Sequence, residues 1–167
     1  AGASAASPEA GVAGPSDAAV WPGKAIRTAA GLEGLFSVSA EDGDTVHGYG
    51  ARASLGCVGV LAEPLALDAA AGYRWLEGPD GPIPFPGFLV SGGWQFAPFK
   101  SFSLTPFGGL SVEFRAEDYS PETVASVAGG IRFAVLLSGR DYLTLTPSVS
   151  VPFTGDASPS VSLALGL

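Results

Sequence analysis

Apolar and polar residues alternate one by one in short segments of this sequence, from about residue 25 to Leu167. Successive side chains of a β-strand point to opposite faces of a sheet, so this alternation predicts strands with one apolar and one polar face. Clusters of turn-forming residues separate eight such segments. Their approximate bounds are 25–39, 47–58, 65–76, 88–97, 101–115, 123–136, 142–153 and 160–167. The sequence therefore predicts an all-β chain.

The composition favours a membrane location for these strands. Hydrophobic residues make up 47% of the chain and charged residues 14%, against about 25% charged residues in soluble domains. No stretch approaches the roughly 18 uninterrupted apolar residues of a membrane-spanning helix. A closed barrel is the other structure that pairs every backbone N–H and C=O group inside lipid. We therefore expect an eight-stranded antiparallel up-and-down transmembrane β-barrel over residues 25–167.

The charged residues test this prediction, because a register set by the apolar residues assigns each charge to one face. Seven charges within the segments all share the polar face: Glu33, Arg52, Asp68, Arg74, Glu113, Arg115 and Arg132. A random choice of face would give this result about once in a hundred cases. Two apolar residues depart from the pattern, Leu35 and Val58.

The polar face is predicted to line the lumen. The interior of an eight-stranded barrel is only just filled by side chains, so small residues and ion pairs fit there and large rings would crowd it. Buried charges need partners, so the seven charges are expected to form an interstrand network that closes the lumen. A narrow, gated solute path is the alternative reading of these charges. Two soluble folds also remain open: a lipocalin-type barrel with its apolar face inside, and a β-sandwich.

Aromatic residues at the segment ends predict two girdles, where amphipathic rings prefer the headgroup boundary of a bilayer. One girdle lies beside the acidic connections and comprises Tyr49, Trp75, Phe88, Phe114 and Phe153. The other lies at the opposite ends of the segments and comprises Trp94, Phe96, Phe102 and Tyr142.

Four connections between segments are predicted to be the longer, acidic loops of one barrel end, opposite tighter turns that contain both Lys and Arg. The carboxylates of these loops are Glu41, Asp42, Asp44, Glu77, Asp80, Glu117, Asp118, Glu122 and Asp156. We interpret them as a solvated, repulsive surface. A surface for divalent cations or a cationic partner is the alternative, although Asp42–Asp44 is far short of a complete calcium loop.

Other function classes find little support. The net charge of −8 argues against nucleic acid as a partner. Cys57 is the only cysteine, so an internal disulfide is impossible, and no Cys/His cluster has metal-ligand spacing. We predict no cofactor and no metal. His47, the only histidine, follows Asp44 closely but has no nucleophile-bearing motif beside it, so we predict that the chain is not an enzyme.

Residues 1–24 are rich in Ala, Gly, Ser and Pro and have no periodicity, which predicts a flexible extension. The first residues lack the basic and apolar regions of a signal peptide. Because a barrel of this kind must be exported, we expect that a signal was removed before Ala1.

The pattern over residues 25–167 resembles the small eight-stranded outer-membrane proteins of the OmpA, OmpX and OmpW type. Leu104–Arg115 and Leu143–Val151 carry the resemblance most clearly. Val161–Leu167 is similar to the terminal strand that the barrel-assembly machinery reads, although Leu167 stands where an aromatic residue is usual. The resemblance implies a monomeric or weakly associating barrel in the bacterial outer membrane, with both termini in the periplasm. Its implied partners are outer-membrane lipid and the assembly machinery, and other envelope proteins through the loops or the extension.

Three functions follow from this interpretation. The first is a structural or surface-interaction role for a barrel with a closed lumen. The second is transport of small hydrophobic solutes, as in OmpW-type proteins, with Pro106 and Pro147 as candidate breaks in the wall because proline removes a ladder hydrogen bond. The third is a lipid A-modifying enzyme built on His47 at the rim.

Overall fold

A computed structural model describes residues 27–41, 44–62, 64–78, 81–99, 101–117, 120–138, 141–155 and 157–167. Its strands are β1 (Arg27–Glu41), β2 (Asp44–Val58), β3 (Leu65–Gly78), β4 (Gly81–Trp94), β5 (Phe96–Phe99), β6 (Phe102–Glu117), β7 (Ser120–Ser138), β8 (Asp141–Pro152) and β9 (Ser160–Gly166). No helix in these ranges is long and apolar enough to cross a membrane. The extension predicted at residues 1–24 lies outside them.

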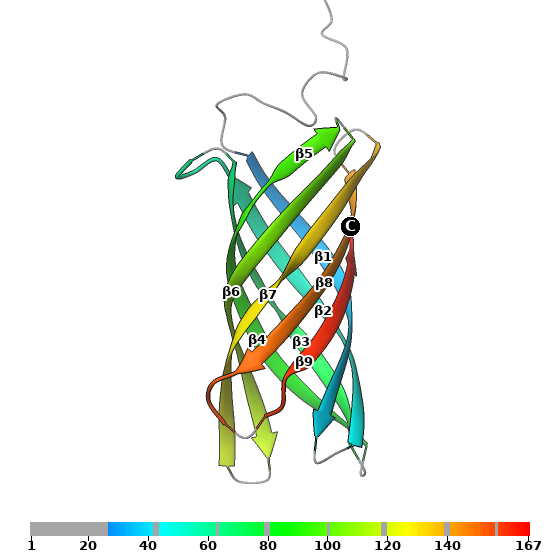
Figure 1. Cartoon of the computed structure of the whole chain (residues 1–167). Helices are drawn as coiled ribbons and strands as arrows, with labels where there is room; N and C mark the ends of the chain where they lie inside the picture. Colours follow the sequence, from blue (N-terminus) through cyan, green and yellow to red (C-terminus); the bar gives the residue numbers. More distant parts are fainter. Residues whose placement is uncertain are drawn as a thin grey trace, which may run out of the picture.

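The strands form one closed antiparallel barrel (Figure 1). Strands that follow one another in sequence are paired, except that β4 pairs with β6 and not with β5; β1 pairs with β9. The short β5 follows β4 after Gln95 and pairs with the same strand, β6. β4 and β5 together therefore occupy one of the eight strand positions of the barrel. The predicted eight-stranded antiparallel barrel is confirmed.

The barrel closes where β1 meets β9. Seven register pairs join the two strands, from Glu33 with Gly166 to Ser39 with Ser160. Beyond them, Leu32 and Leu167 exchange two backbone hydrogen bonds of 3.0 and 3.1 Å. The start of β1 and the end of β9 therefore lie at the same end of the barrel (Figure 1).

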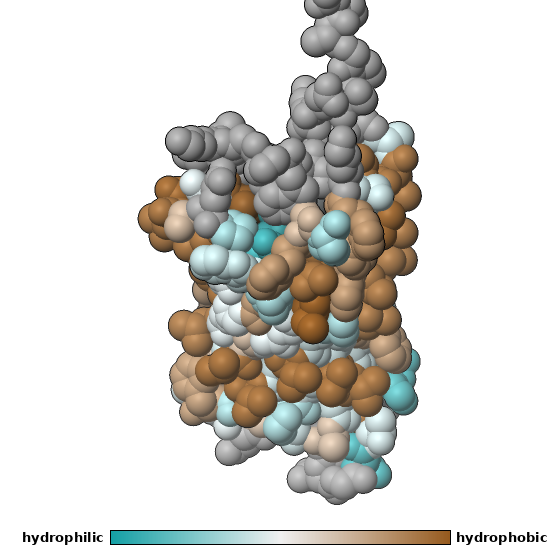
Figure 2. Space-filling view, turned by 45° about the horizontal axis from the view of Figure 1, so that its top comes forward, coloured by the Kyte–Doolittle hydropathy of each residue, from teal (hydrophilic) through white to brown (hydrophobic). Residues whose placement is uncertain are grey.

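Side chains alternate between the lumen and the outer wall along each strand. In β8, Leu145, Val149 and Val151 are exposed, whereas Thr146 is fully buried in the lumen. Figure 2 shows the apolar side chains in brown around the wall. A wall of exposed leucine, valine and phenylalanine is unfavourable in water and suits lipid. The faces therefore have the arrangement of a membrane barrel: apolar side chains outside and polar ones inside.

The prediction of four longer loops at one end of the barrel is wrong for three of the four connections. Register pairs Glu41 with Asp44, Gly78 with Gly81 and Glu117 with Ser120, so two residues separate the strands of each hairpin. Sequences such as Asp42-Gly43 favour two-residue turns, which let the strands pair up to the turn itself. Connections longer than two residues join β2 to β3 at one end and β8 to β9 at the other.

This correction moves several predicted loop carboxylates into strands. Glu41, Asp44, Glu77, Glu117 and Glu122 belong to β1, β2, β3, β6 and β7. We refer to the barrel end that carries these five residues as the carboxylate rim. The other four predicted loop residues, Asp42, Asp80, Asp118 and Asp156, lie outside the described residues.

Candidate functional site

Among the described residues, three ion pairs lie inside the barrel. The Arg52 Nε donates to Glu33 Oε2 between the neighbouring strands β1 and β2, where the two residues are register partners. The Arg74 Nη2 donates to Glu113 Oε2 and joins β3 to β6. Each pair combines a half-buried or buried carboxylate with a guanidinium group that is at least four-fifths buried.

The third ion pair spans the lumen. Arg132 Nη1 lies 2.8 Å from Asp68 Oδ1 and joins β7 to β3, two strands that are not neighbours in the barrel. Along β3, Asp68 comes first, Gly72 is the register partner of Arg52, and Arg74 follows. The three ion pairs therefore lie at different heights; Arg74–Glu113 and Arg132–Asp68 cross part of the lumen, and Arg52–Glu33 joins two neighbouring strands. Arg115 belongs to β6, but its side chain is not among those that the structure describes, so its predicted place in the ion-pair network stays a prediction.

Glycines on neighbouring strands make room for these charges. A Cβ atom on Gly56 would overlap Asp68 Oδ1, and one on Gly166 would lie 2.6 Å from Glu33 Cγ. A Cβ on Gly72 would lie 2.6 Å from the Cα and Cβ atoms of Arg52. In the sequence these glycines alternate with apolar residues, which was a signal that they share the face of the charges. Only the register of the strands shows which charged side chain each glycine accommodates.

The lumen also contains apolar residues that sequence reasoning missed. Leu76, Phe85 and Val124 are buried towards the carboxylate rim. A cavity of about 110 Å³ lies next to them, between apolar residues of β1, β4 and β6 and serines of β8 and β9. In the described part of the chain, Ser37 Oγ and Arg74 Nε border this cavity without a hydrogen-bond partner.

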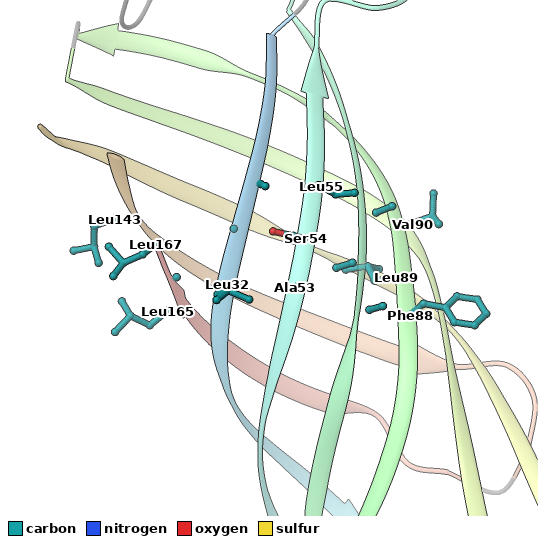
Figure 3. Close-up of a pocket in the computed structure, with 16 residues that line it drawn as sticks. Leu32, Ala53, Ser54, Leu55, Phe88, Leu89, Val90, Leu143, Leu165 and Leu167 are labelled. Atoms are coloured by element: carbon teal, nitrogen blue, oxygen red, sulfur yellow. The ribbon is translucent and has the colours of Figure 1, made fainter. Parts of the chain in front are cut away.

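The outer wall carries a shallow apolar depression of about 970 Å³. Small side chains such as Ala53 and Ala69 form its floor (Figure 3). Exposed Leu143 and Leu165 stand on one side of it, and Phe88 stands on the other. A surface of this composition suits lipid acyl chains.

Aromatic side chains on the outer wall pair across neighbouring strands. Ring centroids lie 5.9 Å apart for Tyr49 and Trp75, 5.7 Å for Phe88 and Phe114, and 6.4 Å for Phe102 and Phe133. Trp94, Phe96 and Phe153 are exposed. Phe36, Tyr73 and Phe133 also take part in these ring contacts; their alternation assigns them to the apolar face, but the predicted girdles did not include them.

Tyr142 is the exception among the predicted girdle residues. It shares its parity with Thr144 and Thr146, which face the lumen, and it is less exposed than its neighbours Asp141 and Leu143. The prediction that it belongs to an outer girdle is wrong, because its position at a strand end was weighed above its parity.

His47 lies on the outer wall of β2. Its ring stacks on Phe36, with centroids 6.1 Å apart and planes at 26°. Asp44 is an odd number of residues away on the same strand, so its side chain belongs to the opposite face. This arrangement gives His47 an aromatic neighbour in place of the orienting carboxylate that acid–base catalysis needs.

We expect the His47→Ala variant and the wild-type barrel to leave outer-membrane lipid equally unchanged, because the ring contact of His47 is with Phe36 and no carboxylate of the described residues is seen to orient it. Mass spectra of the lipid after incubation with each protein measure this. Lipid modified by the wild type but not by His47→Ala would identify His47 as catalytic and contradict the prediction.

The remaining candidates form no assembled site. Asp44 and Glu77 are exposed at the carboxylate rim. Among the described residues, no group of three or more His, Cys, Asp or Glu side chains could hold a metal ion. Cys57 is partly exposed on the outward parity of β2.

No protein-family model and no curated protein matches the sequence significantly. Solved structures match the fold instead. Ail, the attachment invasion locus protein of Yersinia pestis, solved in complex with the heparin analogue sucrose octasulfate, has a TM-score of 0.61 and 16% identity, over 83% of this chain and 94% of Ail. Neisserial surface protein A (NspA) has a TM-score of 0.60 and 13% identity, over 85% of this chain and 96% of NspA.

The fold is that of the small eight-stranded outer-membrane barrels. A second structure of Ail agrees, with a TM-score of 0.58 and 13% identity over 83% of this chain and 94% of Ail. The resemblance to OmpA- and OmpX-type barrels is thus confirmed at the level of fold. Sequence identities of 13–16% support a shared backbone fold. The residues of the lumen and of the rim are therefore interpreted from this chain alone.

Proposed function

We propose that this chain is an integral barrel of the bacterial outer membrane with a structural or surface-interaction role and a lumen closed to axial passage. The observation that carries the proposal is the Arg132–Asp68 ion pair, which reaches from β7 to β3 across the lumen. Two further ion pairs and the buried apolar side chains of Leu76, Phe85 and Val124 fill other heights of the barrel. An eight-stranded barrel has little interior to spare for a continuous water column.

The carboxylate rim is the end proposed to face the outside. The start of β1 and the end of β9 lie at the opposite end, which this orientation places in the periplasm (Figure 1). Sucrose octasulfate, in the complex with Ail, is a polyanion. Exposed Asp44 and Glu77 would repel such a ligand here, so a cationic partner fits this rim better. Lipid around the wall and the assembly machinery at β9 complete the proposed partners.

Conductance across planar bilayers tests the closed lumen. We expect the wild-type barrel to give no steady channel events, because the ion pairs occupy the lumen. The Asp68→Ala/Arg132→Ala variant is expected to pass more current, since it empties the space that these side chains fill. The Asp44→Ala/Glu77→Ala variant, changed only at the rim, is the matched control. Steady wild-type currents equal to those of the luminal variant would contradict the proposal.

Transport of small hydrophobic solutes is the second candidate function. The ladder between β7 and β8 skips Pro147, and the ladder of β6 with β4 and β5 is interrupted beside Pro106. Each proline still pairs on its other side, with Leu163 and Ile131 respectively. These breaks are therefore local, and they do not separate the strands of the wall.

A further inference from the structure

The ladder between β4 and β6 is much shorter than the two strands. It contains seven register pairs, from Gly87 with Glu113 to Gly93 with Phe107. However, β4 begins at Gly81 and β6 continues to Glu117. The last residues of both strands at the carboxylate rim therefore have no ladder partner across this boundary, which we name the β4–β6 seam.

Three prolines explain where the ladder stops. Pro82, Pro84 and Pro86 alternate along β4, so all three share one parity. The β3 ladder continues past them to Gly81, so the N–H groups that they lack belong to the edge of β4 that faces β6. Phe88, the next residue of this parity, again has an N–H group, and pairing with β6 begins beside it, at Gly87.

The hairpins on the two sides of the seam separate at the rim. Figure 1 shows the β6–β7 hairpin at the lower end, apart from the β3–β4 hairpin. On the outer wall, the rings of Phe88 and Phe114 bridge β4 and β6 with centroids 5.7 Å apart and planes at 53°. Side-chain packing thus covers a boundary that backbone hydrogen bonds do not close.

The luminal cavity of about 110 Å³ lies directly behind this seam. Phe85, Gly87 and Leu89 of β4 line it, together with Phe107 and Glu113 of β6. Arg52, Arg74 and Glu113 of the luminal ion pairs also border the cavity. The Arg132–Asp68 pair crosses the lumen farther from the carboxylate rim, since Asp68 precedes Gly72 and Arg74 along β3. The lumen is therefore obstructed beyond the cavity, and a molecule that enters beside Phe85 has to leave the same way.

The lining of the cavity has three chemical characters. Leu35, Phe85 and Phe107 give it apolar surface, and serines face them from β8 and β9. The charged groups of Arg52, Arg74 and Glu113, which belong to the luminal ion pairs, complete the lining. Ser37 Oγ also lines the cavity; this residue is only 2% exposed, and its hydroxyl has no partner in the described part of the chain. A buried hydroxyl without a partner is costly, so a ligand or water that bonds to it is favoured.

We propose that this cavity binds a small amphipathic molecule, of the size and chemistry of a short alcohol, which enters sideways through the β4–β6 seam. The ligand's apolar body packs on Phe85 and Phe107, and its hydroxyl bonds to the serine wall. The volume of about 110 Å³ sets the limit on size, since even benzene occupies a cavity of about 150 Å³. This inference goes beyond the proposed function, because it concerns access from the side, which bilayer conductance does not measure.

Methyl NMR of the detergent-refolded barrel with 1-propanol as the probe tests the site. We expect saturable shifts at the luminal methyl groups of Leu35 and Leu89 and none at Leu163 on the outer wall, which reports 1-propanol in the detergent. Shifts at Leu163 alone, or luminal shifts that do not saturate, would overturn the site, whatever the conductance of the barrel.

The route is tested by restoring the missing donors. The Pro84→Val/Pro86→Val variant can extend the ladder to β6, so 1-propanol exchange at Leu35 and Leu89 is expected to slow about tenfold, the effect of roughly 1.4 kcal/mol of regained hydrogen bonding. Pro147→Val makes the same change away from the seam and serves as the matched control. Equal exchange in both variants would overturn entry through the seam.

A second variant works in the opposite direction and does not depend on forming new hydrogen bonds. Phe114→Ala removes one of the two rings that bridge the seam, so exchange at the luminal methyl groups is expected to become faster. Heat-modifiable gel migration confirms that each variant is folded. Exchange in Phe114→Ala that is no faster than in the wild type would contradict the lateral route.

Discussion

Replacing Glu33 with alanine is expected to lower the free energy of unfolding by about 3 kcal/mol, because it leaves the Arg52 guanidinium without a counter-charge inside the barrel. The Glu33 side chain is 5% exposed and that of Arg52 is 14% exposed, so water can replace little of the lost interaction. Urea unfolding in lipid vesicles, followed by tryptophan fluorescence, measures the change.

Two further variants separate burial from charge. Glu77→Ala removes a carboxylate that is exposed at the carboxylate rim and is expected to cost at most about 1 kcal/mol. Glu33→Leu/Arg52→Leu removes both charges and should recover much of the loss, since the expensive state is one unpaired buried charge. If Glu33→Ala costs no more than Glu77→Ala, the pair does not stabilise the barrel.

Introducing arginine at Leu163 is expected to destabilise the barrel by about 2–4 kcal/mol, because the residue lies on the outer wall away from both ends of β9. Phe153→Arg places the same charge on an exposed residue just beyond β8, where the expected cost is about 0–1 kcal/mol. Unfolding in vesicles compares the two variants. Equal costs at both positions would mean that this wall does not face a bilayer.

The strand faces were predictable from the sequence because each charge reports a face on its own. Arg52, Asp68 and Arg74 needed no knowledge of their neighbours to be assigned to the lumen. To identify their ion-pair partners, however, the neighbouring strands had to be known. Arg132 could have met any of three acids, and its pairing with Asp68 depends on the tilt and stagger that bring β7 opposite β3.

Strand ends were the weakest predictions, for reasons of backbone chemistry. The stretch 81–87 reads as a loop, since prolines alternate in it and proline is rare inside a sheet. In the barrel these prolines share one edge of β4, and the other edge pairs with β3 in full. The sequence shows that backbone N–H donors are missing from this stretch. It does not show which neighbouring strand loses hydrogen bonds as a result, so the seam could not be predicted.

The junction of β1 with β9 sets the order of events during assembly. Leu32 and Leu167 are far apart in sequence, and their two hydrogen bonds form only when β9 reaches β1. Until then both strands are open edges, able to template pairing with another chain. Loop closure over such a separation is slow, so the half-made barrel is the aggregation-prone species. Protection of the two edges before closure is therefore as important to this protein as the stability of the finished wall.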